Sequence, residues 1–292
     1  MKPAAFQYLA PRSEEELIAI LRQHGGEARL LAGGQSLVPM MNFRIVSPAV
    51  LVDINRIREL AFLNSNEVGI ELGALTRHVT LEDSGHVKAR FPLLAEAIRH
   101  VAHRAVRNRG TMGGSLALAY PGAELPLIFV TLGAEVRLRS QAGERWVPVT
   151  SFITGALETA LAEDEYIASA RISHIPSGAG TAFVEVSRRQ GDFALAAAAA
   201  VVGRDERGHI HMVQAAVTGG TDVPLRLPET EQALRGAQPS DLIFEEAARA
   251  GIESIEIAGD HHYPLGYRRM LLAAVLQRAL VAASRVESGH VH

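Results

Sequence analysis

Two glycine-paired segments are the parts of this 292-residue chain whose residue types and spacing suggest chemistry. Residues 32–37 read AGGQSL, and residues 109–115, about eighty positions later, read RGTMGGS. Each segment lies among apolar residues and contains a hydroxyl side chain near its end. Each can therefore present unobstructed backbone N–H groups and a Ser or Thr oxygen to a phosphate. Two such turns suggest a pyrophosphate.

A pair of glycines is also a common way to reverse the chain, and either segment alone could do no more than that. Neither segment matches the G-x-G-x-x-G dinucleotide pattern, and G-x-x-x-x-G-K-[ST] does not occur. An ordinary Rossmann or P-loop site is therefore not supported. The two turns need another explanation.

The composition excludes several classes of function. With 29 Lys and Arg against 32 Asp and Glu, the net charge is −3, and no long basic run is present for non-specific binding of nucleic acid. The absence of cysteine excludes disulfides and any thiolate-held iron–sulfur cluster on this polypeptide. No apolar stretch approaches a membrane span and the first residues lack the core of a signal peptide, so we expect a cytoplasmic protein.

Histidine pairs are the other groups that could bind a ligand. No carboxylate or third histidine lies at a convincing ligand spacing from any pair, so we expect no metal site. The pairs are His261 with His262, His209 with His211, and His290 with His292.

The elements around the first turn can be predicted from the apolar pattern. Ser13 and the glutamates after it predict the start of a helix that ends at the glycines 25 and 26. A strand over 28–32 leads directly into the first turn. The apolar run 50–54 is typical of a strand covered on both faces. The first part of the chain is therefore a small β-α-β-β unit.

The rest of the chain predicts mixed helix and strand, with a boundary in the small-residue segment 177–180. Before the second turn we expect short strands over 68–74 and a helix over 92–102, and after it a half-exposed strand over 136–139. Beyond the boundary we expect strands at 182–187 and 211–218, an alanine-rich run at 194–202, and helices near 241–251 and 265–284.

The residues around both turns resemble the FAD-binding (medium) subunit of the molybdenum hydroxylases, the carbon monoxide dehydrogenase and xanthine dehydrogenase family. LAGGQSLVPMMNFR at 31–44, followed by LVDI at 51–54, is similar to the family's first flavin-binding loop. VRNRGTMGGSLA at 106–117, continuing through PGAELP at 121–126, is similar to its second loop. Weaker matches are GALTRH at 73–78, RRQGDFA at 188–194 and YRR at 267–269. Together they span nearly the whole chain in the family's order.

The resemblance implies an α+β architecture, a two-lobed FAD-binding fold of the vanillyl-alcohol-oxidase (PCMH) type with FAD between the lobes. Residues 1–177 are expected to form this domain, with lobes of about 1–55 and 56–177. Residues 178–286 are expected to form an α+β C-terminal domain of the carbon monoxide dehydrogenase flavoprotein type, with a small sheet and helices. Residues 287–292 are expected to be a tail.

The resemblance also assigns the residues of the two turns to the cofactor. A side chain on any of the four paired glycines would block the backbone from a phosphate, so replacement by Val is expected to reduce FAD occupancy. One side of the pyrophosphate would be held by Ala32, Gly33, Gly34, Gln35 and Ser36, flanked by Leu31 and Leu37, and the other by Thr111, Gly113, Gly114 and Ser115.

Further positions carry an implied role beside a structural alternative. Glu124 matches an acidic residue that binds ribose or ribityl hydroxyls, but a carboxylate at a helix start explains it equally well. Val101 and Ile167 match apolar positions beside the adenine or the flavin ring, and each could be plain core. Phe193 occupies the place of a Tyr near the isoalloxazine, where it could stack but not donate a hydrogen bond. Tyr120 departs from the family pattern; it could fill the pocket mouth or face solvent.

The activity that the resemblance implies is electron transfer, with no catalytic residue on this chain. In the family, a large subunit with the molybdopterin cofactor oxidises the substrate, and a small subunit with [2Fe-2S] clusters relays electrons to the flavin. The flavin then reduces an external acceptor. The absence of cysteine here agrees with clusters on a partner, and a dimer of heterotrimers is expected.

Two other functions stay open from the sequence. One is a stand-alone flavin reductase of the same fold, similar to the enolpyruvyl-sugar reductase of cell-wall synthesis, which would need a proton donor and substrate-binding residues after Gly180. The other is a scaffold subunit that no longer binds flavin, against which the intact glycine pairs argue.

Overall fold

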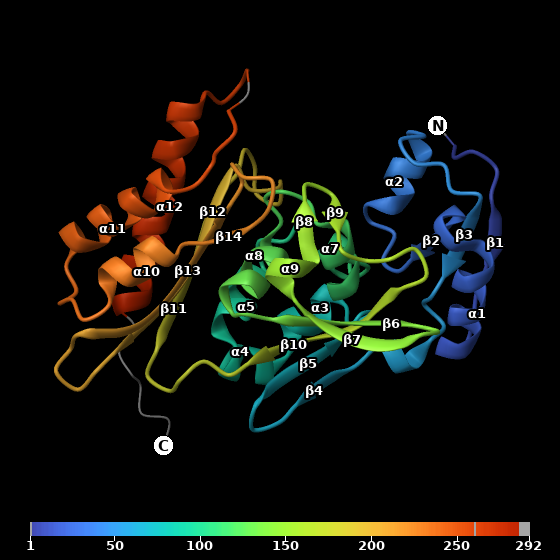
Figure 1. Ribbon diagram of the computed structural model, residues 1–292, viewed down its shortest axis with the longest axis horizontal. Helices are drawn as coiled ribbons and strands as arrows, with labels where there is room; N and C mark the ends of the chain where they lie inside the picture. Colours follow the sequence, from blue (N-terminus) through green and yellow to red (C-terminus); the bar gives the residue numbers. More distant parts are fainter. Residues whose placement is uncertain (1, 260, 286–292) are drawn as a thin grey trace.

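The computed structural model describes residues 2–259 and 261–285, which form three units along the chain (Figure 1). The first unit is a three-stranded parallel sheet in the order β1-β3-β2, with β1 (Gln7–Leu9), β2 (Ala28–Leu31) and β3 (Val50–Asp53). Helix α1 (Glu14–His24) connects β1 to β2. It begins after Ser13, whose Oγ accepts a hydrogen bond from the Glu16 N–H, and ends at Gly25 with φ of 46°. The strands and the helix α1 of the predicted β-α-β-β unit are confirmed, with a further short helix between β2 and β3.

Helix α2 (Leu37–Asn42) follows the first glycine turn and was not predicted. It contains Pro39, a residue that argues against a helix when the sequence alone is considered. Proline is tolerated in a first helical turn because the N–H it lacks has no partner there. The first turn therefore connects a strand to a short helix.

The middle unit is an antiparallel five-stranded sheet in the order β4-β5-β10-β6-β7, packed with several short helices around the largest buried cluster. Its strands are β4 (Leu63–Ser65), β5 (Gly69–Gly73), β6 (Glu135–Ser140), β7 (Gly143–Pro148) and β10 (Tyr166–Ser173). Its helices are α3 (His78–Asp83), α4 (Gly85–Arg90), α5 (Pro92–Ala97), α6 (Arg104–Arg107), α7 (Met112–Leu118), α8 (Glu124–Thr131) and α9 (Val149–Phe152). The hairpin of β8 (Ile153–Gly155) and β9 (Glu158–Thr159) and two 3₁₀ turns, Gly25–Glu27 and Arg58–Leu60, complete the two units.

The predicted helix over 92–102 is wrong in its second half. Helix α5 ends at Ala97, and Ala102 has a left-handed φ of 45°. The buried Arg107 imposes this path, because its Nη1 donates to the carbonyls of Val101 (2.9 Å) and Ala102 (3.0 Å) while its Nε pairs with Glu82 (2.8 Å). A contact between distant segments overrides the local helical pattern.

The C-terminal unit is an antiparallel sheet of β11 (Gly180–Val186), β12 (Ala196–Arg204), β13 (Ile210–Thr218) and β14 (Leu225–Arg226). Helices α10 (Pro228–Leu234), α11 (Asp241–Glu253) and α12 (Leu265–Arg285) pack on one face (Figure 1), and α5 and α8 contact the other. The alanine-rich strand β12 is thus covered on both sides. Ala196, Ala198 and Ala200 belong to one core cluster and Ala197 and Ala199 to the other. Small side chains let two helical layers approach the same strand.

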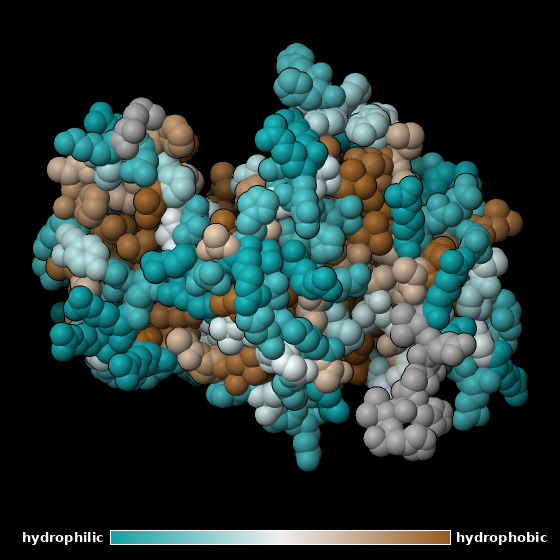
Figure 2. All heavy atoms as spheres, turned by 180° about the vertical axis from the view of Figure 1, so that it is seen from behind, coloured by the Kyte–Doolittle hydropathy of each residue, from teal (hydrophilic) through white to brown (hydrophobic). Residues whose placement is uncertain are grey.

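Seen from behind, polar side chains cover most of the surface, and a notch separates the N-terminal unit, at the left, from the rest (Figure 2). None of the described helices has the length and apolarity to cross a membrane. The predicted tail 287–292 and the pair His290 and His292 lie outside the described residues.

Candidate functional site

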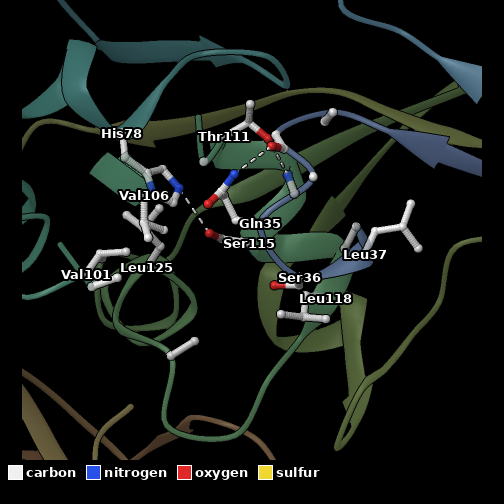
Figure 3. A pocket seen from close by; sticks show the side chains of 18 of the residues that line it. Gln35, Ser36, Leu37, His78, Val101, Val106, Thr111, Ser115, Leu118 and Leu125 are labelled. Carbon is white, nitrogen blue, oxygen red and sulfur yellow. Dashed lines mark hydrogen bonds between the residues drawn. The ribbon is translucent and has the colours of Figure 1, made fainter. Parts of the chain in front are cut away.

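The two glycine turns lie directly against each other. A Cβ placed on Gly33 would lie 2.4 Å from the carbonyl oxygen of Arg109 and 3.0 Å from the Cα of Gly110, so the backbones touch. Both turns line one cavity of about 300 Å³, and Figure 3 shows Gln35, Ser36, Thr111 and Ser115 around the same space. Segments about eighty residues apart in sequence are thus brought to one site.

The first turn presents a row of backbone donors. Among the described residues, none accepts a hydrogen bond from the N–H of Gly33, Gly34, Gln35 or Ser36. Gly34 has a φ of 73°, which favours glycine, and Gln35 Nε2 donates to the Gly33 carbonyl at 3.2 Å. Successive free N–H groups in a tight turn form a concave anion site.

The second turn uses most of its donors inside the protein. Thr111 caps helix α7, and its Oγ1 accepts a hydrogen bond from the Gly114 N–H at 3.1 Å. The Ser115 N–H donates to the Thr111 carbonyl at 3.1 Å. Of the described residues, none accepts from the Thr111 N–H, so this amide stays available at the cavity.

Two more amides of the second turn pair with the segment that follows strand β5. The Met112 N–H donates to the Thr76 carbonyl and the Gly113 N–H to the Ala74 carbonyl, both at 2.9 Å. The expectation that the second turn offers unobstructed N–H groups is therefore wrong for residues 112–115. What it offers is the Thr111 N–H and the hydroxyl of Ser115.

The glycines are also needed for contacts within the protein. A Cβ on Gly113 would lie 2.7 Å from the Ala74 Cβ and 2.9 Å from the Ala74 carbonyl oxygen. On Gly114 it would lie 2.7 Å from Thr111 Oγ1, the atom that caps the helix. At Gly113 the missing side chain lets helix α7 approach the segment after β5, and at Gly114 it leaves room for the capping hydroxyl.

His78 supports the hydroxyl of the second turn. Its ring is 4% exposed, and its Nε2 lies 3.1 Å from Ser115 Oγ (Figure 3). Burial lowers the pKa of His78 to about 4, so the imidazole is neutral at pH 7. No described residue pairs with its buried Nδ1. His78 is the last residue of the GALTRH segment, but nothing in the sequence indicated a role for it.

A second cavity of about 430 Å³ adjoins the first. It shares with the first cavity Arg29, Leu30, Ala32, Gly114 and Ala117, so the two spaces meet at the glycine segments. Among the assigned residues, Ile167 and Gly113 line this second cavity alone. Leu31 lines neither cavity. The other twelve assigned residues all line the first cavity: Ala32, Gly33, Gly34, Gln35, Ser36, Leu37, Val101, Thr111, Gly114, Ser115, Glu124 and Phe193.

Comparison with known proteins identifies the family. The family model described as the FAD binding domain in molybdopterin dehydrogenase matches residues 4–175, and that of the CO dehydrogenase flavoprotein C-terminal domain matches residues 181–283. This chain belongs to the FAD-binding subunits of molybdenum hydroxylases. The resemblance drawn from the two turns is confirmed. The exact division after residue 177 stays a prediction.

Similar proteins align with nearly the whole chain. The carbon monoxide dehydrogenase medium chain of Hydrogenophaga pseudoflava is 37% identical over 97% of this chain and 98% of that protein. The 6-hydroxypseudooxynicotine dehydrogenase complex subunit alpha of Paenarthrobacter nicotinovorans is 37% identical over 97% and 96%.

Solved structures agree on the fold. A chain of carbon monoxide dehydrogenase from Hydrogenophaga pseudoflava superposes with a TM-score of 0.93 at 37% identity, covering 97% of this chain and 98% of that one. A chain of quinoline 2-oxidoreductase from Pseudomonas putida 86 gives 0.93 at 35% identity, covering 98% and 99%. The predicted fold class is confirmed.

In this FAD-binding subunit, the structure confirms that Glu124 starts a helix, and its place in the first cavity leaves the role toward sugar hydroxyls a prediction. It is the first residue of helix α8 and it lines the first cavity, with 3% of its surface exposed. Burial raises the pKa of Glu124 to about 8, with a smaller contribution from the nearby charge of Glu185. A carboxyl that is protonated at pH 7 can donate as well as accept a hydrogen bond.

Phe193 lines the first cavity of the FAD subunit, and Tyr120, which does not line that cavity, stacks against Phe193. Their rings stack with centroids 4.0 Å apart and planes at 28°. Phe193 is 47% exposed and Tyr120 36%. Tyr120 therefore covers one face of Phe193, which leaves the other face of that ring for a planar ligand.

Proposed function

We propose that this subunit holds FAD across its two glycine turns and transfers electrons from iron–sulfur clusters of a partner to an external acceptor. The observation that carries the proposal is the row of free amides at residues 33–36, opposite the Thr111 N–H and the Ser115 hydroxyl in one cavity. A diphosphate is the part of FAD that such donors recognise.

The residues fit the rest of the cofactor as well. The two cavities that meet at the turns provide separate spaces for the two halves of a dinucleotide. We assign the isoalloxazine to the first cavity, beside Val101 and Phe193, and the adenosine to the second, beside Ile167. The protonated Glu124 carboxyl would bind ribityl hydroxyls. Leu31 would contribute to FAD binding through its backbone at the end of β2. Leu37 would contribute to FAD binding from the start of α2.

FAD, when bound, accepts and releases electrons one or two at a time. This chain's part is to bind the diphosphate with main-chain donors, to orient the ring between apolar side chains, and to leave one edge accessible. We propose a large subunit with the molybdopterin cofactor and a small subunit with [2Fe-2S] clusters as partners, in a dimer of heterotrimers. The names of its relatives, a medium chain and a complex subunit, support a complex of several subunits.

Purification of the tagged full-length chain from its native host tests the proposal. Two partner subunits should co-purify, with molybdenum, iron and one FAD per copy of this chain. Reductant for the clusters should bleach the flavin absorbance in the complex, and an external acceptor should restore it. A complex that lacks FAD, or that transfers no electrons to it, contradicts the proposal.

The chain expressed alone, compared with the purified complex, separates the other two functions. The chain expressed alone should show only diaphorase-like activity with artificial acceptors, whereas turnover of a physiological substrate would support a stand-alone reductase. A complex with intact partners but no flavin would support a scaffold. We also propose a cytoplasmic location, which fractionation of the host cells tests.

A further inference from the structure

Two polar side chains connect the glycine turns through their carbonyl groups. Asn55 Nδ2 donates to the carbonyl of Ala32, in the first turn, at 2.8 Å. It also donates to the carbonyl of Leu31, the last residue of β2, at 3.3 Å. Asn55 Oδ1 accepts from Arg77 Nη2 at 2.5 Å. Arg77 Nη1 donates to the carbonyl of Arg109, in the second turn. We name Asn55 and Arg77 the carbonyl bridge.

The orientation of Asn55 follows from its other partners. Asp53 Oδ1 accepts from the Asn55 backbone N–H at 3.0 Å and from its Nδ2 at 2.6 Å. Asp53 Oδ2 in turn accepts from the Tyr8 hydroxyl at 2.6 Å. Nδ2 thus faces oxygen acceptors and Oδ1 faces a guanidinium, which determines the amide orientation.

Arg77 belongs to the segment that pairs with the second turn. It forms an isolated antiparallel bridge with Thr111, and the N–H of the next residue, His78, donates to the Gly110 carbonyl at 3.0 Å. Its side chain reaches from there to Asn55, beyond strand β3. The planar guanidinium serves two acceptors at once, which a lysine ammonium on a flexible stem does less well.

The bridge determines where the donors of the first turn point. The Ala32 carbonyl and the Gly33 N–H belong to one planar peptide group and point in opposite directions. Because Asn55 anchors the Ala32 oxygen, the Gly33 N–H is directed away from Asn55. Because Arg77 anchors the Arg109 oxygen, against which Gly33 packs, the spacing of the two turns is set by the same bridge.

We propose that Asn55 and Arg77 are positioning residues that hold the two turns at the separation and orientation required by one diphosphate. The inference rests on the proposed FAD site. Neither residue lines either of the two cavities, so both act through the backbone of the turns and not by contact with the ligand.

The test measures FAD affinity and stability separately, in the purified complex after removal of its flavin. FAD is titrated while its fluorescence quenching is followed, and the thermal unfolding of the FAD-free complex is recorded. Arg77→Met and Asn55→Ala should each raise the Kd for FAD about 30-fold, since each breaks a charge-assisted bridge. Arg77→Lys should recover part of that loss, to about 5-fold, by restoring one of the two bonds.

The Kd of the double variant distinguishes loss of the carbonyl bridge from general destabilisation of the protein. Asn55→Ala with Arg77→Met should bind FAD within about 3-fold of either single variant, because residues of one network are not additive. Arg171→Met is the matched control, since it removes an arginine paired with Glu135 outside both cavities and should leave the Kd unchanged.

The outcomes separate the two proposals. Failure of the wild-type complex to bind FAD overturns the proposed function. Tight binding by the wild type together with unchanged Kd in Asn55→Ala and Arg77→Lys overturns the positioning role alone. A lower unfolding temperature without a change in Kd also overturns it. If Arg77→Met does not fold, the other two variants decide.

Discussion

The two glycine turns look alike in sequence and differ in how their backbone donors are used. In the first turn, four consecutive amides at residues 33–36 have no acceptor among the described residues. In the second, the amides of residues 112–115 all donate within the protein. The first leaves four donors available for the diphosphate that we propose it binds. The second supports the site and contributes a hydroxyl and one amide.

The difference follows from what each turn is attached to. The second turn starts helix α7, whose Met112 and Leu116 are fully buried in the largest core cluster. The first turn leads into α2, in which Val38 is exposed, as is Phe43 at its end. A turn inside a packed core must satisfy its own donors, whereas a turn at the edge of a lobe can leave them for a ligand.

The largest expected effect is at the contact between the turns. Gly33→Val should raise the Kd for FAD at least about 1,000-fold, roughly 4 kcal/mol, because the new side chain pushes the first turn away from the Arg109 carbonyl. Titration of the FAD-free complex measures it. Gly85→Ala, where an added Cβ meets nothing within 4 Å, is the control. A Kd within tenfold of wild type would contradict the geometry.

Of the two turns, only the second lies against a buried histidine, which should give it a pH dependence. The pKa of His78 is lowered from 6.5 to about 4, so the unfolded chain binds a proton at this residue first, and the contribution of His78 to stability falls as pH decreases from 6.5 to 4. Glu124, whose pKa is raised to about 8, contributes in the opposite sense, so the difference between wild type and a His78 variant isolates the contribution of His78. Across this interval His78 should lower the free energy of unfolding by about 3 kcal/mol, and His78→Gln should abolish that decrease. Urea unfolding of the FAD-free protein across this range measures it. Gln35→Ala, in a turn without a titratable side chain, should keep the wild-type slope, and equal slopes for wild type and His78→Gln would refute the assignment.

Gly113→Ala should act on stability more than on binding. Its Cβ would contact Ala74 in the packed core, so the free energy of unfolding should fall by about 2 kcal/mol. The folded fraction should still bind FAD within about tenfold of wild type, unlike Gly33→Val. Chemical denaturation and FAD titration of one preparation compare the two. Gly266→Ala, with open space at its Cβ, serves as the helical control.

The smallest effects distinguish the two serines. Ser36→Ala and Ser115→Ala should each raise the Kd about fivefold, the equivalent of one hydrogen bond of about 1 kcal/mol. Ser115→Ala should also lower the free energy of unfolding by about 1–2 kcal/mol, because the buried His78 Nε2 loses its partner. Ser36 forms no capping bond, so its variant should leave stability unchanged. Equal stability of the two variants would remove the distinction.

Much of the fold could be predicted because it depends on local signals. Ser13 and the glycines at 25 and 26 set the limits of α1, and the apolar run at 50–54 predicted β3. Helix α2 was missed because of Pro39, and the end of α5 was missed because Arg107, ten positions beyond it, determines the path of the loop.

The sequence by itself determined the family, the pair of turns and the residues assigned to the cofactor, because glycine patterns and strand ends are local properties. Only the tertiary structure decided which amides are free, that Val101 and Ile167 line different cavities, and that Asn55 and Arg77 connect the two turns. The physical reason is that a hydrogen-bond partner is a spatial neighbour. The acceptors at Ala74 and Thr76 occupy the donors of the second turn from more than thirty positions away in the chain.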